Sequence, residues 1–446
     1  MKGPFAQHPV LKHALGAEKQ PFLSSGPRVW TYGQFLDQVQ KTAAGLRKIK
    51  PKTLGIQQHD IFNFLVILFA AECAGKKTVI LSPQLGKGDI AQLAKKIGFK
   101  ILPHPNPLPK GEGDRSKKKN PSPPGRGQGE GVCRRGEIIL TTSGSTGLPK
   151  GVVRTWESLT AAVSAAPKKG RSIWLLTYDF ASFAGLQVIL HALMNQDQIV
   201  AAGRDPVKAI KRAKITHISG TPSFWRGLLA QISSKDLPAL KHITLGGEAI
   251  PAELLIRIKK KFPRAAITQI YASTEMGACF YVRDGKPGLP ASVLKGRANA
   301  VQAKIAGGEL YIKSRRAMKG YAGAGRAAGW FATGDMVRME NNRIFFAGRK
   351  SNIINVGGFK VYPYEVEEVL YQVPGILQAR VSGEPSGLLG NLVRADIEIT
   401  PEAREEDVQR RAVALCQERL ARPKVPRVIA FSRKPLVHGS KISRRS

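Results

Sequence analysis

The feature that most constrains the fold is an alternation of short β-rich runs with helical stretches between residue 53 and about residue 269. Residues 53–58 and 77–83 are extended runs, and each precedes an apolar or amphipathic helical stretch. The same pairing recurs at residues 242–248 and 251–262. Strands that alternate with helices in this way indicate parallel βαβ units. We therefore predict the α/β class, with a large N-terminal domain of layered sheets and helices.

The alternation stops between residues 103 and 132, where Pro, Gly and Lys dominate. This segment contains two similar blocks, PLPKGEG and PGRGQGEG, and lacks the apolar side chains that a folded core needs. We interpret residues 104–132 as an inserted surface loop, because the entropic cost of lengthening a loop grows only slowly with its length.

Two smaller units are predicted after residue 271. The first is a small β subdomain, in which Asn341 and Asn342 indicate a hairpin turn between two β-rich runs. The second is an α+β unit with a helix opening at Pro363, two strands, a helix over residues 405–420 and a last strand. The predicted domain ranges are 1–348 for the N-terminal domain and 349–446 for the C-terminal domain.

Composition excludes several classes of protein. Gly and Pro number 46 and 29 among 446 residues, below the level at which composition alone indicates a fibre or a wholly disordered chain. The richest apolar run, residues 64–71, is well short of the ~20 residues of a membrane span, so no span is expected. The cysteines are too scattered for a zinc site or a disulfide framework, which favours a reducing cytoplasm. They are Cys73, Cys133, Cys279 and Cys416.

The chain is strongly basic, with 70 Lys and Arg against 32 Asp and Glu and a formal net charge of +38. Such a field attracts nucleic acid, anionic lipid and phosphorylated ligands. The basic residues are spread over the whole length, however, and no helix-turn-helix, zinc-finger or RNA-binding aromatic pattern accompanies them. We therefore expect a generally basic surface and no specific nucleic-acid partner.

A loop rich in Ser, Thr and Gly follows the β-rich run at residues 137–142, in the stretch EIILTTSGSTGLPKGVV. Its hydroxyls and accessible backbone amides suit anionic oxygens, and a lysine adds charge. The spacing is not that of a P-loop, because the lysine is followed by Gly151. Standing alone, the stretch would be better interpreted as a flexible turn between strands. The candidate phosphate-binding residues are Thr142, Ser143, Gly144, Ser145, Thr146, Gly147 and Lys150.

Four further motifs follow in order: YASTE (271–275), ATGD (332–335), GRKSNIINVGGFKVYPYEVE (348–367) and PLVHGSKISRR (435–445). Together with SGSTGLPKG, they resemble the signatures of the adenylate-forming superfamily, which includes acyl- and aryl-CoA ligases, luciferases and peptide-synthetase adenylation domains. The resemblance covers nearly the whole chain and is nearest to compact acyl-CoA synthetases.

The resemblance implies an ATP-dependent carboxylic acid–thiol ligase. In this superfamily a carboxylate attacks the α-phosphorus of ATP to give an acyl-adenylate and pyrophosphate, and a thiol then displaces AMP. The implied cofactors are ATP, Mg²⁺ and CoA, or the phosphopantetheine of a separate acyl carrier protein, and the substrate is a small carboxylic acid. An alternative is a stand-alone adenylating enzyme that loads an acyl or amino acid onto a carrier protein. A rival from another class is a basic nucleic-acid- or membrane-associated protein that keeps the fold without turnover.

The resemblance also assigns roles to single residues. The Ser/Thr/Gly loop with its lysine would hold the β- and γ-phosphates, and Glu275 would bind Mg²⁺, a hard cation that takes one or two carboxylates plus substrate phosphates. Thr274 would bond the α-phosphate and Tyr271 would stack on adenine. Asp335 would accept hydrogen bonds from the ribose hydroxyls. Arg349 would contact ribose or phosphate.

The resemblance places one stretch beside the adenine and another beside the acid substrate. The GGE segment matches the superfamily's adenine-side loop, and its residues are Gly246, Gly247 and Glu248. In the substrate-side stretch TYDFASFAGL, Ala181 and Ser182 stand where an aromatic–histidine pair is usual. The identity of the acid is therefore open, although Phe180 and Phe183 suggest an apolar or aromatic one.

Lys441 is the principal catalytic candidate. In the superfamily the lysine of this last motif reaches from the C-terminal domain to the α-phosphate and the attacking carboxylate, where it supplies a point charge. A lysine on a separate small domain implies that this domain is mobile, and the resemblance places the hinge at Ser351. Gly358 would let the backbone approach a pantetheine arm closely.

Overall fold

The structure is a computed structural model of the chain. It describes residues 5–102, 136–142, 149–165, 170–203, 205–233, 237–296, 301–325, 329–432, 435–438 and 441–442. For residues 437, 438, 441 and 442 it describes the backbone alone. The predicted inserted loop at 104–132 lies outside the described residues.

A large, mainly parallel sheet organises the first half of the fold. Its central strands β12, β11, β10, β8, β9 and β1 run parallel, and β13 and β2 add antiparallel edges. Parallel strands need crossover connections, and helices supply them here. The spatial order is β13 (Gly277–Val282), β12 (Ala266–Ser273), β11 (His242–Gly246), β10 (His217–Gly220), β8 (Ile173–Leu176), β9 (Gln198–Ala201), β1 (Pro21–Ser25) and β2 (Arg28–Thr31).

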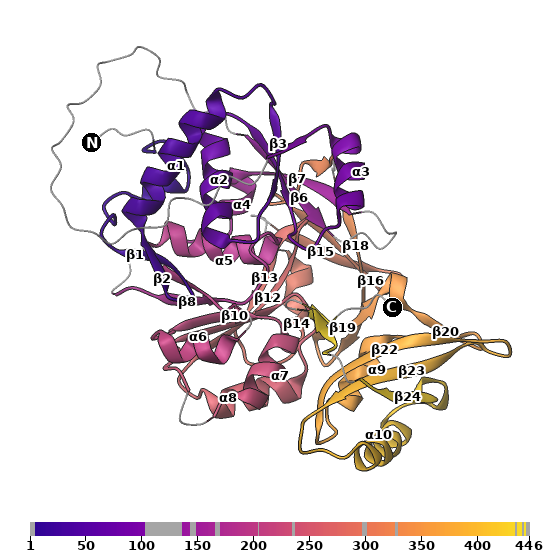
Figure 1. The fold of residues 1–446 in the computed structure, drawn as a ribbon. Coiled ribbons are helices and arrows are strands. Elements are labelled where there is room, and N and C mark those ends of the chain that lie inside the picture. Colours follow the sequence, from indigo (N-terminus) through magenta and orange to yellow (C-terminus); the bar gives the residue numbers. More distant parts are fainter. Residues whose placement is uncertain are drawn as a thin grey trace, which may run out of the picture.

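A second sheet lies across a shared layer of helices (Figure 1). Its order is β17 (Gly320–Tyr321), β7 (Lys150–Thr155), β6 (Glu137–Thr142), β4 (Lys77–Leu81), β3 (Thr53–Gln57) and β5 (Lys100–Ile101). Strands β6 and β7 pair antiparallel, so the Ser/Thr/Gly stretch joins two neighbouring strands. The predicted strand-and-helix alternation is confirmed in this region.

The largest core cluster combines buried side chains of both sheets with the helices between them. Helix α2 is apolar on every side, which is typical of a helix buried in a large core. The side chain of Asp60 caps it by accepting a hydrogen bond from the backbone N–H of Asn63 at 2.8 Å. None of the helices in the described residues is long and apolar enough to cross a membrane.

The N-terminal helices are α1 (Tyr32–Arg47), α2 (Ile61–Cys73), α3 (Lys87–Ile97), α4 (Trp156–Thr160), α5 (Phe183–Met194), α6 (Pro206–Arg212), α7 (Pro222–Gln231) and α8 (Ala252–Lys261). Helices α6, α7 and α8 follow β9, β10 and β11 along the chain and enclose a second cluster of buried side chains against the large sheet. Short 3-10 turns occupy Leu11–Ala14, Ala291–Lys295, Lys350–Asn352 and Arg422–Lys424.

The predicted small β subdomain is a third sheet with its own core. Its order is β14 (Leu289–Pro290), β19 (Arg343–Arg349), β18 (Phe331–Glu340), β16 (Glu309–Ser314) and β15 (Val301–Ala306). Asn341 and Asn342 join β18 to β19 with φ angles of +46° and +58°, which confirms the predicted hairpin turn.

The C-terminal part forms a separate sheet with two helices and its own core. Pro363 opens the first helix, as predicted. The elements are β20 (Ile354–Val356), β21 (Phe359–Val361), α9 (Pro363–Leu370), β22 (Ile376–Ser386), β23 (Gly390–Ile399), α10 (Glu405–Arg419) and β24 (Val428–Phe431). A final pair comprises β25 (Val437–His438) and β26 (Lys441–Ile442).

The predicted fold class is confirmed, while some elements were not anticipated. The hairpins β1–β2 and β20–β21 and the pair β25–β26 were not predicted, because their strands are short and carry no long periodic pattern. The domain boundary between residues 348 and 349 stays a prediction.

Candidate active site

Three loops of the candidate site meet at the carboxyl edge of the large sheet. Strands β10, β11 and β12 are parallel neighbours, so the segments that follow them lie side by side. These segments carry Ser223 at the start of α7, the GGE turn, and the pair Thr274 and Glu275. Ligands of open α/β sheets bind outside the carboxyl ends of the strands.

The GGE turn requires its glycines. A Cβ at Gly246 would lie 2.8 Å from the carbonyl oxygen of Ile270, and Gly247 has φ +84°, which favours glycine. The turn directs Glu248 toward the first turn of α7. One carboxylate oxygen of Glu248 accepts hydrogen bonds from the backbone N–H of Ser223 at 3.0 Å and from its hydroxyl at 2.7 Å. A carboxylate is favourable at this helix N-terminus.

Tyr271 and Asp335 meet across two sheets. The Tyr271 hydroxyl donates to Asp335 Oδ2 at 2.6 Å, and the Tyr271 ring stacks on Phe346 with 5.0 Å between the ring centroids. Burial, followed by the nearby Asp335 charge, raises the pKa of Tyr271 well above its ordinary value. The Arg349 Nε lies 3.1 Å from Asp335 Oδ1. Asp335 is therefore held from both sides, by a neutral phenol and by a guanidinium.

The TGD turn is built by hydrogen bonds around Gly334, which has φ +74°. The Thr333 hydroxyl donates to the Leu310 carbonyl at 2.7 Å and accepts from the Asp335 N–H at 3.1 Å. The buried carboxylate of Glu309 accepts from the Gly334 N–H at 2.9 Å, and its other oxygen accepts from Lys350 Nζ at 3.1 Å. Sequence reasoning missed Glu309, because a lone glutamate at a strand start carries no motif.

Arg154 holds the YASTE segment in place by hydrogen bonds to its backbone. Sequence reasoning missed this residue too. This fully buried side chain donates from Nη1 to the carbonyls of Thr274 and Glu275 at 3.0 and 3.2 Å, and from Nη2 to the Ser158 carbonyl at 3.0 Å. Burial lowers the pKa of Arg154 to about 10, while the nearby Cys279 and Glu275 favour its charged form. A signal did exist: Arg154 is a lone arginine inside the apolar run GVVRT.

Tyr321 connects the two sheets at the site. Its hydroxyl donates to Glu275 Oε1 at 3.3 Å, and the Lys150 ammonium lies 5.4 Å from the centroid of its ring. Lys150 pairs in register with Thr142 across β6 and β7, so both flank the Ser/Thr/Gly loop. The structure thus brings Thr142, Lys150 and Glu275 to one region. The remaining loop candidates Ser143, Gly144, Ser145, Thr146 and Gly147 lie outside the described residues.

The two candidates on the C-terminal part are less fully described. Gly358 lies in the exposed turn between β20 and β21 with φ +90°, and its N–H donates to Asn355 Oδ1 at 3.0 Å. In Figure 1, β20 lies on the outer side of this part, away from β12. The backbone of Lys441 lies in β26, which packs against α7, while its side chain lies outside the described atoms.

The two phenylalanines that suggested an apolar acid belong to the core. Phe180 packs on Phe64 with 5.0 Å between centroids, and the buried Phe183 lies under the Arg154 guanidinium at 5.5 Å. Their contacts inside the protein explain their apolar character without a substrate.

Comparison with protein families identifies this arrangement. A family model described as AMP-binding enzyme matches residues 10–322, which contain both large sheets and the YASTE segment. The chain belongs to the AMP-binding enzyme family. The predicted superfamily resemblance is therefore confirmed.

Relatives within the AMP-binding enzymes include two ligases of Bacillus species. A long-chain-fatty-acid–CoA ligase of Bacillus subtilis is 29% identical over 344 residues, which cover 69% of this chain and 60% of that protein. A 2-succinylbenzoate–CoA ligase of Bacillus velezensis is 30% identical over 316 residues, covering 65% of this chain and 63% of that protein. The matched region thus spans less than two thirds of either relative.

Solved structures of other proteins show the same fold over nearly the whole chain. The anthranilate–CoA ligase AuaEII in complex with anthranoyl-AMP has a TM-score of 0.78 at 19% identity and covers 97% of this chain and 94% of that one. The O-succinylbenzoate–CoA synthetase of Bacillus subtilis in complex with ATP and magnesium ion has a TM-score of 0.69 at 20% identity, with 95% of each chain covered. Both similarities confirm the predicted architecture.

Proposed function

We propose that this AMP-binding enzyme is an ATP-dependent carboxylic acid–thiol ligase. It joins a small carboxylic acid to AMP with release of pyrophosphate, and then transfers the acyl group to a thiol with release of AMP. The observation that carries the proposal is the Asp335 carboxylate, held between Tyr271 and Arg349, in the same region as Glu275 at the carboxyl edge of the sheet.

Asp335 is suited to the ribose of a nucleotide. A carboxylate offers about four acceptor directions, and Tyr271 and Arg349 each approach a different oxygen of Asp335. In the proposed arrangement the same carboxylate also accepts hydrogen bonds from the two ribose hydroxyls. Because the pKa of Tyr271 is raised, its hydroxyl stays a donor and keeps Asp335 oriented. In the proposed arrangement the partly exposed ring of Tyr271 stacks on adenine.

Glu275 fits a magnesium ion bound together with phosphates. Its carboxylate is partly exposed and accepts a hydrogen bond from Tyr321 on Oε1. Within the described residues, no group of three or more His, Cys, Asp or Glu side chains could hold a metal. Mg²⁺ needs only one or two protein carboxylates when substrate phosphates and water complete its shell. When bound, it would neutralise phosphate charge; Thr142, Lys150 and the loop between them would hold the phosphates.

Lys441 would complete the site from the C-terminal part. Its strand β26 packs against α7, the helix whose first turn binds Glu248. We propose that its ammonium approaches the α-phosphate during adenylation, where Thr274 supplies a further contact. Arg349 then keeps Asp335 in place while negative charge builds up at the phosphorus.

The acceptor is proposed to be CoA, since the named relatives are CoA ligases. A separate acyl carrier protein is the alternative that the experiment below distinguishes. The cytoplasm is the proposed location: ATP and CoA are available there, and the described cysteines Cys73, Cys279 and Cys416 form no disulfide, which fits a reducing compartment.

The function is tested with the purified chain by acid-dependent exchange of labelled pyrophosphate into ATP, over a panel of fatty, aryl and amino acids. We expect exchange with one class of acid, and thioester formation with CoA but not with purified carrier proteins. Lys441→Ala should abolish exchange but spare thioester formation from added acyl-adenylate. Lys260→Ala, at an exposed position of α8 outside every motif, is the control and should leave both reactions unchanged. Absence of exchange with every acid would instead support a binding protein without turnover.

A further inference from the structure

A buried arginine joins the large N-terminal part to the C-terminal sheet. Arg226 lies in the second turn of α7 and is 4% exposed, and Gln378 lies in β22 and is 2% exposed. The guanidinium donates to Gln378 Oε1 from Nε at 3.2 Å and from Nη2 at 3.1 Å. It also lies over the ring of Tyr371 from the C-terminal part, 3.8 Å from the centroid. One side chain therefore makes polar and aromatic contacts across the interface.

The same contact reaches the candidate nucleotide site through one serine. Gln378 Nε2 donates to the Ser223 carbonyl at 3.0 Å, and Arg226 Nη2 donates to the Ser223 hydroxyl at 3.2 Å. That hydroxyl in turn donates to Glu248 of the GGE turn at 2.7 Å. Because buried polar groups left unpaired are costly, breaking this chain of bonds at the interface is unfavourable.

The two side chains that Arg226 is seen to contact across the interface, Gln378 and Tyr371, are uncharged. A buried guanidinium is costly unless its donors and its flat face are satisfied. Here the amide of Gln378 satisfies the donors and the ring of Tyr371 covers the face by a cation–π contact. Rotation of the C-terminal part would break the contacts with Gln378 and Tyr371 together. Arg226 would then keep its hydrogen bond to the Ser223 hydroxyl.

The orientation that this contact holds is the one with β26 against α7. Both β22 and β26 of the C-terminal part pack on α7, and β26 carries Lys441. The turn with Gly358 follows β20 and is exposed, and Figure 1 shows β20 on the outer side of the same part. The contact therefore accompanies the placement of Lys441 proposed for adenylation. A thiol step in which Gly358 approaches a pantetheine arm, as the superfamily resemblance implies, needs another orientation.

We propose that Arg226 and Gln378 form a latch that holds the C-terminal part in the adenylation orientation and couples it to Glu248. Both are positioning residues, since they act through Ser223 and through the placement of Lys441. The latch must open before the thiol step. This inference rests on the proposed ligase function and adds to it the residues that set the balance between its two half-reactions.

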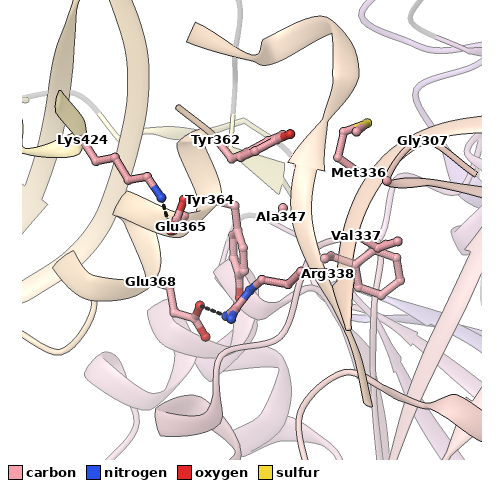
Figure 2. A pocket seen from close by; sticks show the side chains of 12 residues that line it. Gly307, Met336, Val337, Arg338, Ala347, Tyr362, Tyr364, Glu365, Glu368 and Lys424 are labelled. Atoms are coloured by element: carbon pink, nitrogen blue, oxygen red, sulfur yellow. Dashed lines mark hydrogen bonds and ion pairs between the residues drawn. The ribbon is translucent and has the colours of Figure 1, made fainter. Parts of the chain in front are cut away.

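A second contact across the same interface provides a matched control. Arg338 of β18 faces Glu368 of α9 at 4.0 Å, beside a cavity of about 310 Å³ between the β subdomain and the C-terminal part (Figure 2). The Arg338 side chain is 51% exposed and also contacts Glu340. An exposed ion pair of this length contributes little to stability. Arg338→Ala thus removes an interface arginine without removing a buried contact.

The test compares the full-length wild type with Arg226→Ala, Gln378→Ala, the double variant and Arg338→Ala. Acid-dependent pyrophosphate exchange measures adenylation, and release of AMP from added acyl-adenylate and CoA measures the thiol step. We expect each latch variant to lose at least about tenfold in adenylation, as truncating one partner of a buried charged contact does. The thiol step should stay within about twofold of wild type or accelerate, and the double variant should be no worse than Arg226→Ala.

Hydrogen–deuterium exchange supplies a readout that does not depend on turnover. In both latch variants, but not in Arg338→Ala, amides of α7 and β22 should exchange faster. Equal loss of both half-reactions, additive losses in the double variant, or unchanged exchange at α7 and β22 would overturn the latch. A wild type that adenylates no acid would refute the ligase function instead, and the hydrogen exchange would still decide whether the contact holds the two parts together. If Arg226→Ala does not fold, Gln378→Ala, which keeps the arginine and its hydrogen bond to Ser223, is the second variant that tests the latch.

Discussion

Arg154→Met should destabilise the protein and displace the YASTE segment at the same time. The substitution keeps an unbranched side chain of similar length but removes three hydrogen bonds to the carbonyls of Ser158, Thr274 and Glu275. The three hydrogen bonds are part-buried, so each carbonyl left without a partner costs about 1 kcal/mol, the low end of the observed range, and the three together cost about 3 kcal/mol. The substitution also removes the cost of burying the guanidinium, which offsets part of this loss. The free energy of unfolding should therefore fall by at most about 3 kcal/mol.

Urea unfolding followed by tryptophan fluorescence measures this loss, since Trp156 lies close to Arg154 in the sequence and is fully buried. With an m-value of about 3 kcal/mol/M, at the top of the small-protein range, a 3 kcal/mol loss lowers the urea midpoint by about 1 M. In urea-free buffer, the freed carbonyls of Thr274 and Glu275 should reduce pyrophosphate exchange by about 100-fold, as misplacement of a catalytic group by about 1 Å does. Arg338→Met is the control on an exposed strand position. An unchanged midpoint together with unchanged exchange would show that Arg154 does not position this segment.

Three further predictions concern single side chains. His8 is buried, and burial lowers its pKa to about 4. The stabilisation from keeping it neutral is therefore complete above pH 6.5 and disappears as pH falls toward 4. His8→Asn should flatten the dependence of the free energy of unfolding on pH in this range. Asp335→Asn should raise the KM for ATP about tenfold in initial-rate assays and change kcat less, and an unchanged KM would contradict the ribose role. Glu309→Leu leaves the Gly334 N–H unpaired and should raise the same KM, whereas Glu309→Gln should not.

Much of the fold was predictable because its strands and helices follow strong local patterns. The helix α2 and the strands β3 and β4 stand out as apolar runs, and Asn341 with Asn342 specified a turn by backbone preference alone. The hairpin β1–β2 and the pair β25–β26 consist of short strands without a long periodic pattern, and β1 also pairs with β9, which lies far away in the sequence.

Candidate-site residues that belong to a sequence motif could be predicted. Residues that act only through their contacts in the folded protein could not. Asp335 and Glu275 belong to recognisable motifs, and the structure places them near Tyr271 and Tyr321. Arg154 acts through backbone carbonyls of the turn after β12, more than a hundred residues later in the chain. A contact of this kind leaves no spacing in the sequence, so only the folded structure reveals it.

Helix α7 explains how motifs so far apart in sequence can act together. Ser223 in its first turn binds Glu248, and Arg226, three residues later, binds Gln378 of the C-terminal sheet. Residues three apart lie on the same face of a helix, so one face contacts the nucleotide-side turn at its end and the C-terminal part along its side. Because β26 packs on the same helix, a change in the orientation of the C-terminal part must alter both the placement of Lys441 and the support of Glu248. Under the proposed function, contacts that never touch the substrate would therefore separate the two half-reactions.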